Sequence, residues 1–153
     1  NAIAKVEQKL FHSYYHVGDN GRVNEIGSLV TDGGQLNAHI RLINEANITN
    51  ADFLQDVTQI NGDLELINLS NLASLTGLKN LTDISGSLQI ISDTSLKNLD
   101  GLQNLSPSFS GKLIISNDSG LTDCLSLCPL VQNGHVSFEG DNGTCMISLA
   151  KCS

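Results

Sequence analysis

The sequence predicts a mainly β fold, a right-handed β-helix or leucine-rich solenoid of about five coils with about 24 residues in each. Three observations lead to this prediction: two neighbouring stretches are nearly identical, their period is constant, and their apolar residues fall into columns. The segment GDLELIN begins at Gly62 and GSLQIIS at Gly86, and related segments begin at Ala38, Gly111 and Gly134. Successive starts are 24, 24, 25 and 23 residues apart. A fixed period of this length is typical of chains in which each repeat stacks on the one before it.

The first part of each repeat is predicted to be a β-strand. Two apolar columns lie two positions apart, which is the spacing that places side chains on one face of a strand. The first column consists of Ile40, Leu64, Leu88, Leu113 and Val136. The second consists of Leu42, Leu66, Ile90, Ile115 and Phe138.

The second part of each repeat is predicted to bend. Its apolar columns recur every three positions, which is too short for a continuing helical stripe, and Asp, Asn, Ser, Thr and Gly fill the places between them. Segments such as LTGLKNL and LDGLQNL therefore favour turns over a long α-helix. Each coil is expected to contain one firm strand, a bend and one or two shorter strand-like faces.

The repeat pattern divides the chain into three parts. Residues 1–37 do not follow the repeat and are predicted to form an N-terminal cap or an assembly arm, residues 38–133 the repeat solenoid, and residues 134–153 a C-terminal coil with a cysteine cap. Four residues of the first part occur at helical spacing and predict an amphipathic helix over the first coil. They are Ile3, Val6, Leu10 and Tyr14. In the alternative, this segment packs on a neighbouring subunit.

All four cysteines, Cys124, Cys128, Cys145 and Cys152, lie close to the end of the sequence. An even, clustered set predicts two disulfides and an oxidising compartment. Cys145 follows Cys124 by 21 residues and Cys152 follows Cys128 by 24, so each pair is separated by about one coil, and these pairings are favoured among the three connectivities. The alternative of a zinc site is disfavoured because the spacing in CLSLC is too wide and only His135 lies nearby.

The charge balance restricts the partners. Eight basic and sixteen acidic residues give a formal net charge of −8, which repels nucleic acids and anionic membranes and leaves neutral or cationic partners. No apolar run reaches 18 residues, so membrane insertion is not expected. Because the first residue is Asn1 rather than Met, we expect a processed chain or a fragment from which any signal peptide has been removed.

From about residue 38 to residue 153 the chain resembles the receptor L-domain-like repeat proteins of receptor ectodomains, fungal cell walls and secreted bacterial proteins. The resemblance rests on the motifs GDLELIN and GSLQIIS, followed by LTGLKNLTDI and LDGLQNL. The ending SNDSGLTDCLSLCPL is similar to the terminal coil of the bacterial members. The resemblance implies an extracellular or cell-surface binding or scaffolding module with no shared catalytic residues and no cofactor.

Six asparagines stand in glycosylation sequons: Asn47, Asn68, Asn80, Asn104, Asn117 and Asn142. The repeat itself generates those at Asn80 and Asn104, and Pro107 makes Asn104 a poor acceptor. Asn47 and Asn142 lie outside that column and are the favoured sites, with Asn68, Asn80 and Asn117 as further candidates if the source glycosylates.

Two other polar patterns are candidate binding sites. Asn44, Asn68, Ser92 and Asn117 form a column that is either a ligand-binding row or an internal ladder, and the ladder is favoured. His12 and His16 are four residues apart and would share a helix face, but no third ligand has a suitable spacing, so no metal site is predicted.

Enzymatic and ice-binding functions are disfavoured by the columns. Lys79, Lys97 and Lys112 fall in different columns, so that no basic groove of the kind found in polysaccharide-acting β-helix enzymes is expected. An ice-binding face needs Thr or Ser in successive coils, but the outward strand positions carry different residue types. These residues are Arg41, Glu65, Gln89, Ile114 and Ser137.

The predicted function is an extracellular or cell-surface, non-enzymatic module for adhesion, ligand binding or scaffolding. Its expected partner is a protein or a glycan. The alternative is a structural subunit of a surface filament, in which the partners are copies of the same chain joined through the N-terminal segment and the solenoid ends.

Overall fold

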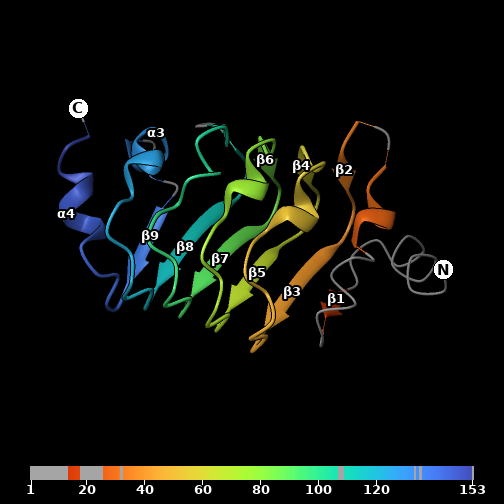
Figure 1. Ribbon diagram of the computed structural model, residues 1–153. Helices are drawn as coiled ribbons and strands as arrows, with labels where there is room; N and C mark the ends of the chain where they lie inside the picture. The colour runs from red at the N-terminus through yellow and green to blue at the C-terminus, as the bar shows by residue number, and fades with distance from the viewer. Residues whose placement is uncertain are drawn as a thin grey trace.

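The computed structural model describes residues 14–17, 26–31, 33–106, 109–132, 134 and 136–152. They form two all-parallel sheets (Figure 1). The large sheet contains, in spatial order, β1 (Tyr14–Val17), β3 (His39–Ile43), β5 (Leu64–Ile67), β7 (Ser87–Ile91), β8 (Lys112–Ser116) and β9 (Val136–Glu139). The small sheet contains β2 (Gln35–Leu36), β4 (Gln59–Ile60) and β6 (Asp83–Ile84).

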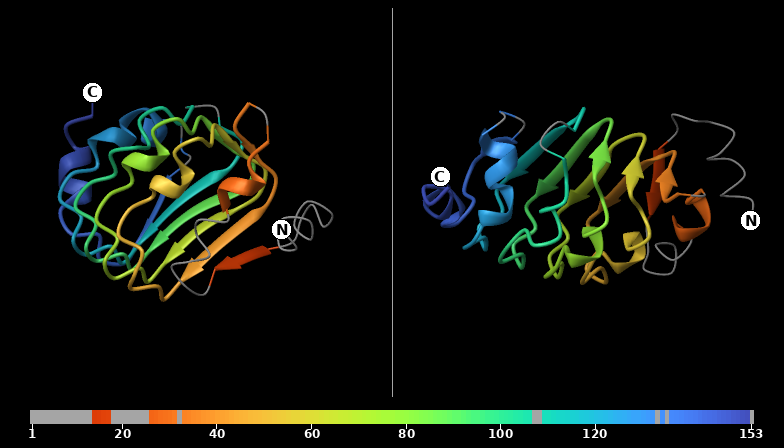
Figure 2. Two further views of the ribbon diagram at one scale, coloured as in Figure 1. Left: turned by 45° about the vertical axis from the view of Figure 1, so that its right-hand side comes forward. Right: turned by 90° about the horizontal axis from the view of Figure 1, so that it is seen from above.

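Short helical segments lie across the molecule from the large sheet (Figure 2). Four are 3₁₀ segments: η1 (Ile26–Leu29), η2 (Asp52–Leu54), η3 (Thr76–Leu78) and η4 (Leu125–Leu127). Two are single-turn α-helices near the C-terminus, α3 (Cys128–Gln132) and α4 (Cys145–Leu149). No helix in the described part of the chain is both long and apolar enough to cross a membrane.

The prediction of a right-handed β-helix or leucine-rich solenoid is wrong. The described residues form two separate parallel sheets of six and three strands with short helical segments, an α/β-like arrangement, and no closed coil is present. The strands of the small sheet are only two residues long, and no strand of the described chain continues that sheet beyond β6. A mainly β coil with several continuous faces therefore does not form.

Local hydrogen bonds explain why the second part of each repeat turns rather than extending. A polar side chain accepts the backbone N–H of the residue two positions later, a bond that starts a turn. The bonds run from Asp52 to Asn50 (2.9 Å), Thr76 to Ser74 (3.2 Å), Asp100 to Asn98 (3.1 Å) and Leu125 to Asp123 (2.9 Å). Three of these turns lead directly into η2, η3 and η4.

The strand columns of the large sheet lie where the period of two places them. Ile40 pairs with Leu64, Leu64 with Leu88, Leu88 with Leu113 and Leu113 with Val136. The second column is aligned in the same way from Leu42 to Phe138. Up to β8 both columns are buried, whereas in β9, the last strand of the sheet, Val136 and Phe138 are half-buried.

Glycines mark the places where successive repeats approach most closely. A Cβ added to Gly86 or Gly111 would collide with the backbone carbonyl of the glycine one repeat earlier, Gly62 or Gly86. A Cβ on Gly77 would collide with the carbonyl of Ala51, and one on Gly101 with that of Leu75. Successive backbones can therefore pack this closely only where no side chain intervenes.

In the large sheet, the residue that follows each strand from β3 to β9 adopts the left-handed backbone conformation. These residues are Asn44 (φ 60°), Asn68 (54°), Ser92 (59°), Asn117 (57°) and Gly140 (67°). Asparagine and glycine tolerate this conformation better than other residues do, which gives a conformational reason for the asparagine column. Ser92 is the member of the column with the poorest intrinsic preference.

We expect Ser92→Asn to raise the free energy of unfolding by about 0.5–1 kcal/mol, because asparagine relieves part of the cost of the left-handed conformation. Ser92→Val should instead lower it by more than that, since a β-branched side chain resists positive φ. Urea unfolding followed by circular dichroism would measure both changes. An asparagine variant no more stable than the wild type would contradict the conformational explanation.

The N-terminal segment departs from its prediction. Tyr14, the last member of the predicted helical stripe, lies in β1, which pairs in parallel with β3 through Tyr14 and His39. The helix prediction is therefore wrong for residues 14–17, while Ile3, Val6 and Leu10 lie outside the described residues. Within the segment 1–37, predicted as a cap or arm, β1 and β2 extend the two sheets by one strand each.

Candidate functional site

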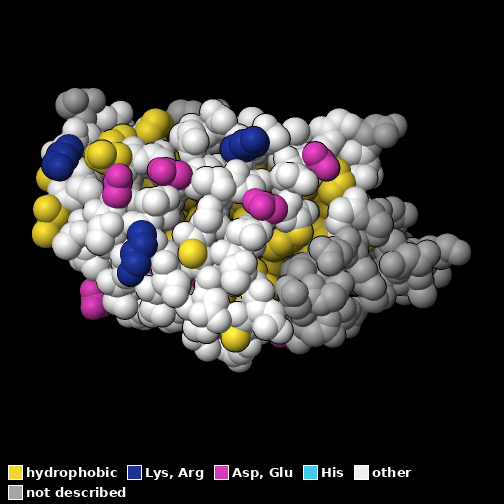
Figure 3. Space-filling model, viewed as in Figure 1, with side chains coloured by type: hydrophobic (Ala, Val, Ile, Leu, Met, Phe, Trp, Pro, Cys, Tyr) yellow, Lys and Arg dark blue, Asp and Glu magenta, His cyan; other side chains and the backbone are white. Residues whose placement is uncertain are grey.

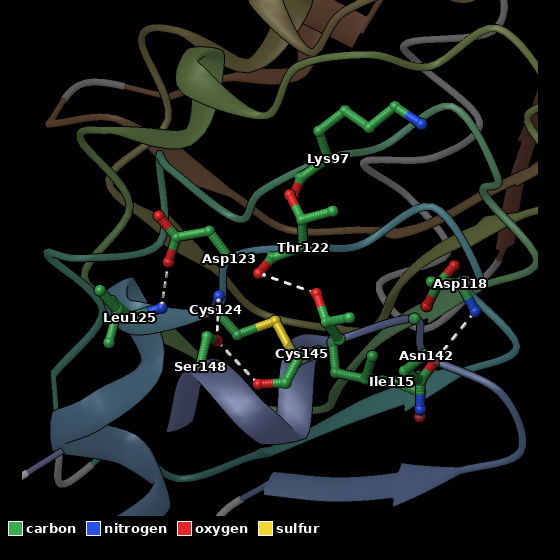
Figure 4. Close-up of a disulfide and its surroundings, with 12 residues drawn as sticks. Lys97, Ile115, Asp118, Thr122, Asp123, Cys124, Leu125, Asn142, Cys145 and Ser148 are labelled. Carbon is green, nitrogen blue, oxygen red and sulfur yellow. Dashed lines mark hydrogen bonds between the residues drawn. A yellow bond between two sulfur atoms is a disulfide. The ribbon is translucent and has the colours of Figure 1, made fainter. Parts of the chain in front are cut away.

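Two disulfides fasten the C-terminal end, and Figure 4 shows the one between Cys124 and Cys145. Cys124 is bonded to Cys145 with a Cα–Cα distance of 5.2 Å, and Cys128 to Cys152 with a distance of 5.4 Å, which is the pairing that the sequence separations favoured. All four cysteines are thus in disulfides and cannot serve as zinc thiolates. The two bonds indicate an oxidising compartment.

Hydrogen bonds support the buried disulfide from both sides. Ser148 Oγ accepts the backbone N–H of Cys124 (2.8 Å) and donates to the carbonyl of Cys145 (2.7 Å), while Cys124 and Cys145 are fully buried. Thr144 Oγ1 donates to the carbonyl of Thr122 (3.2 Å). The end of the chain is therefore joined to the preceding repeat by covalent and polar contacts together.

The outward face of the large sheet is the broadest regular surface formed by the strands. Its central row comprises Arg41, Glu65, Gln89, Ile114 and Ser137, in register on neighbouring strands. Nε of Arg41 lies 3.5 Å from Oε2 of Glu65. The next row begins with three half-buried isoleucines on neighbouring strands, Ile43, Ile67 and Ile91, and continues with Ser116 and Glu139.

The turn-bearing face carries no concentration of one charge. Figure 3 shows a few acidic and basic side chains scattered among uncharged polar ones. Lys79 follows η3, Lys97 lies in the turn after β7 and Lys112 begins β8, so the three lysines belong to different elements. Hydrophobic side chains gather at the end where α4 lies, and Met146 and Ile147 of this helix are 56% and 70% exposed.

The asparagine column does form contacts between repeats. Nδ2 of Asn68 donates to Oδ1 of Asn44 (2.7 Å), and Oδ1 of Asn117 accepts the backbone N–H of Asp141 in the next repeat (3.3 Å). These residues are exposed, and their side chains link neighbouring turns as a ladder would. The column therefore has a structural use that does not require a ligand.

A second ladder, buried and missed by sequence reasoning, runs one residue further along the turns. The backbone N–H of Leu69 donates to Oδ1 of Asp93 (2.8 Å), that of Asp93 to Oδ1 of Asp118 (2.7 Å), and that of Asp118 to Oδ1 of Asn142 (3.0 Å). Both aspartates are fully buried. The recurrence of Asp, Asp and Asn at a spacing of 25 and 24 residues was the signal that could have identified it.

Burial raises the pKa of both aspartates. Loss of solvent is the largest cause for each, and it raises the pKa of Asp93 to about 8 and that of Asp118 to about 7, from an ordinary value of 3.8. Backbone N–H donors act in the opposite direction, and the neighbouring charge of Asp118 raises the pKa of Asp93 further. The pair therefore retains protons in mildly acidic solution.

The predicted glycosylation sites differ in their surroundings. Asn142 is 6% exposed, and its Nδ2 donates to the carbonyls of Ile115 and Glu139, so a glycan on this nitrogen does not fit the folded structure. Asn47 is exposed. Asn68, Asn80 and Asn117 are also exposed, although each uses its amide in a hydrogen bond. Asn47 remains the favoured prediction.

The histidine pair and metal binding are only partly covered by the structure. His12 lies outside the described residues, and so does the side chain of His16. Within the described ranges, no group of three or more His, Cys, Asp or Glu side chains could hold a metal ion.

Comparisons with protein-family models, with curated proteins and with solved structures find no match to the chain.

Proposed function

We propose that the protein is a non-enzymatic binding module, located outside the cell or at its surface, that binds a protein ligand through the outward face of the large sheet. The paired isoleucines Ile43, Ile67 and Ile91 carry this proposal. Outward positions of a strand normally carry polar residues, because they do not contribute to the core. Three adjacent apolar side chains at such positions favour a surface that is covered when a partner binds.

The composition of this face favours a protein over a glycan. Ile114 lies one strand beyond Ile91 and extends the apolar surface, while Arg41, Glu65 and Gln89 supply charged and amide groups beside it. These two outward rows contain no Phe, Tyr or Trp from β3 to β8, and stacking on aromatic rings is a common mode of sugar recognition. The two disulfides support an extracellular location.

The test replaces the apolar surface without disturbing the core. Ile67→Glu/Ile91→Glu is compared with Ala73→Glu, a control at an exposed position outside the large sheet. Each protein is applied to a peptide library derived from secreted and surface proteins and to a glycan array. We expect peptide binding that weakens at least about tenfold in Kd for the double variant and is unchanged for the control. Binding to glycans alone, or peptide binding equal in both variants, would overturn the proposal.

A filament subunit is the second candidate, and the C-terminal end favours it. β9 is the last strand of the large sheet, so one side of its backbone lacks a strand partner among the described residues, and Met146 and Ile147 of α4 are exposed at the same end of the molecule. A second copy added at this end would make a contact that propagates without closing. Analytical ultracentrifugation of the wild type and Ile147→Lys would test this, since a wild-type monomer at all concentrations excludes the filament.

A further inference from the structure

The buried aspartate ladder leaves two oxygen atoms in an unusual position. Oδ1 of Asp93 and Oδ1 of Asp118 each accept a backbone N–H from the preceding repeat. Oδ2 of each residue is buried and has no hydrogen-bond partner. A buried carboxylate oxygen without a donor is costly, because it loses its hydration and gains nothing in return.

Asn142, the last member of the buried ladder, shows that a neutral side chain suits these positions. Its Oδ1 accepts the backbone N–H of Asp118, as the aspartate Oδ1 atoms do for the preceding repeats, and its Nδ2 donates to the carbonyls of Ile115 (3.4 Å) and Glu139 (3.0 Å). The neutral amide is thus an acceptor on one side and a donor on the other. A carboxyl group has the same capacity only when Oδ2 carries a proton.

Among the described residues, no cation compensates the charge of the pair. The group that faces Asp93 from the turn before it is Leu69, and the group that faces Asp118 from the turn after it is Asn142, neither of which titrates. Between these two positions Asp93 and Asp118 face one another, and the negative charge of Asp118 disfavours ionisation of Asp93. Desolvation and mutual repulsion therefore act in the same direction.

We propose that Asp93 and Asp118 are held in the folded protein as neutral carboxylic acids with the proton on the buried Oδ2, so that acid tightens the fold and ionisation of the pair loosens it. Asp93 and Asp118 thus form a pH-sensitive contact between the turns that follow β7 and β8, whatever ligand the protein binds.

The direction of the pH dependence follows from the protons bound in each state. The pKa values of about 8 and about 7 in the fold exceed the ordinary 3.8, so between pH 4 and pH 7 the folded protein holds protons that the unfolded chain has released. Stability from these groups is fully present below about pH 4 and is lost as the pH rises to about 8. The equilibrium constant for unfolding should rise about tenfold per pH unit for each carboxyl that stays protonated.

The experiment measures urea unfolding of the full chain from pH 4.5 to pH 9 for the wild type, Asp93→Asn/Asp118→Asn and the control Asp56→Asn/Asp100→Asn. The control removes the same number of carboxyl groups from exposed positions. We expect the unfolding constant of the wild type and of the control to rise steeply with pH between 4.5 and 7, and the ladder variant to lose most of that rise. Equal pH profiles in the ladder variant and the wild type would overturn the proposal.

A second measurement keeps the test decisive if the double variant does not fold. Carbon-13 NMR of aspartate carboxyl groups in the wild type should show two resonances that remain in the protonated position at pH 6. If every aspartate resonance has reached its ionised position by pH 6, the neutral-acid assignment is wrong, whatever the variants do.

Discussion

Gly77→Ala is expected to lower the free energy of unfolding by about 3 kcal/mol, at the upper end of the range for overpacking. The added Cβ would overlap the backbone carbonyl of Ala51 and lie 2.6 Å from the backbone nitrogen of Asp52. Both obstacles are main-chain atoms, and they cannot move aside as a flexible side chain would. The collision must therefore be relieved by separating two repeats, which breaks their packing and their hydrogen bonds. Urea unfolding followed by circular dichroism would measure the loss.

Gly27→Ala is the matched control for this substitution. Gly27 lies in η1, and no heavy atom is found within 4 Å of the position of its added Cβ. Because alanine has less freedom than glycine in the unfolded chain, we expect the control to be between unchanged and about 1 kcal/mol more stable. Equal losses in the two variants would show that close approach of the backbones does not explain the glycine at position 77.

Cys124→Ala/Cys145→Ala should lower the free energy of unfolding by about 3 kcal/mol or more. Most of this follows from releasing a loop of 21 residues in the unfolded state. The two cysteines are fully buried, so their removal also leaves a small cavity beneath α4. Denaturant unfolding under non-reducing conditions would give the value.

The second disulfide distinguishes the effect of loop release from the effect of lost packing. Cys128 and Cys152 close a loop of 24 residues, almost the same length, but both are only half-buried. Cys128→Ala/Cys152→Ala should therefore show a similar loss from loop release and a smaller one from packing. If this variant loses more stability than Cys124→Ala/Cys145→Ala, burial does not determine the contribution of the two bonds.

Periodicity predicted the large sheet well because one physical rule determines its strands. Alternation of apolar residues places every second side chain in the core, and a slip of one position would expose the whole column. The strands β3, β5, β7, β8 and β9 begin one or two residues after the starts predicted from Ala38 to Gly134, and the alignment of both apolar columns followed from the sequence alone. The cysteine pairing followed from the same register, since residues one repeat apart are neighbours.

The bends in the second part of each repeat followed from the sequence, but the length of the strands there did not. The expected strand-like faces are only two residues long in β2, β4 and β6, so the expectation of a closed β coil failed. Tyr14 satisfies a helical spacing, yet it pairs as a strand because the edge of β3 offers backbone partners. Tertiary pairing overrode local preference at this site.

The candidate sites show the same limit. Aspartate after a strand suggests a solvated turn, so nothing in the single residues Asp93 and Asp118 indicated that they are fully buried. Their alignment with Asn142 is visible only after the repeats are set in register. Glycosylation at Asn142 was favoured because that residue lies outside the main sequon column, a property that carries no information about burial.

The one-way direction of the buried ladder bears on how such a chain can grow by gene duplication. The backbone N–H groups of Leu69, Asp93 and Asp118 each donate to a side chain of the following repeat. A unit of one repeat duplicated between β7 and β8 would bring its own acceptor to the unit before it and find one in the unit after it. Internal duplication therefore preserves every rung, and a lineage can lengthen this protein from its middle while the cysteine-linked end is inherited unchanged.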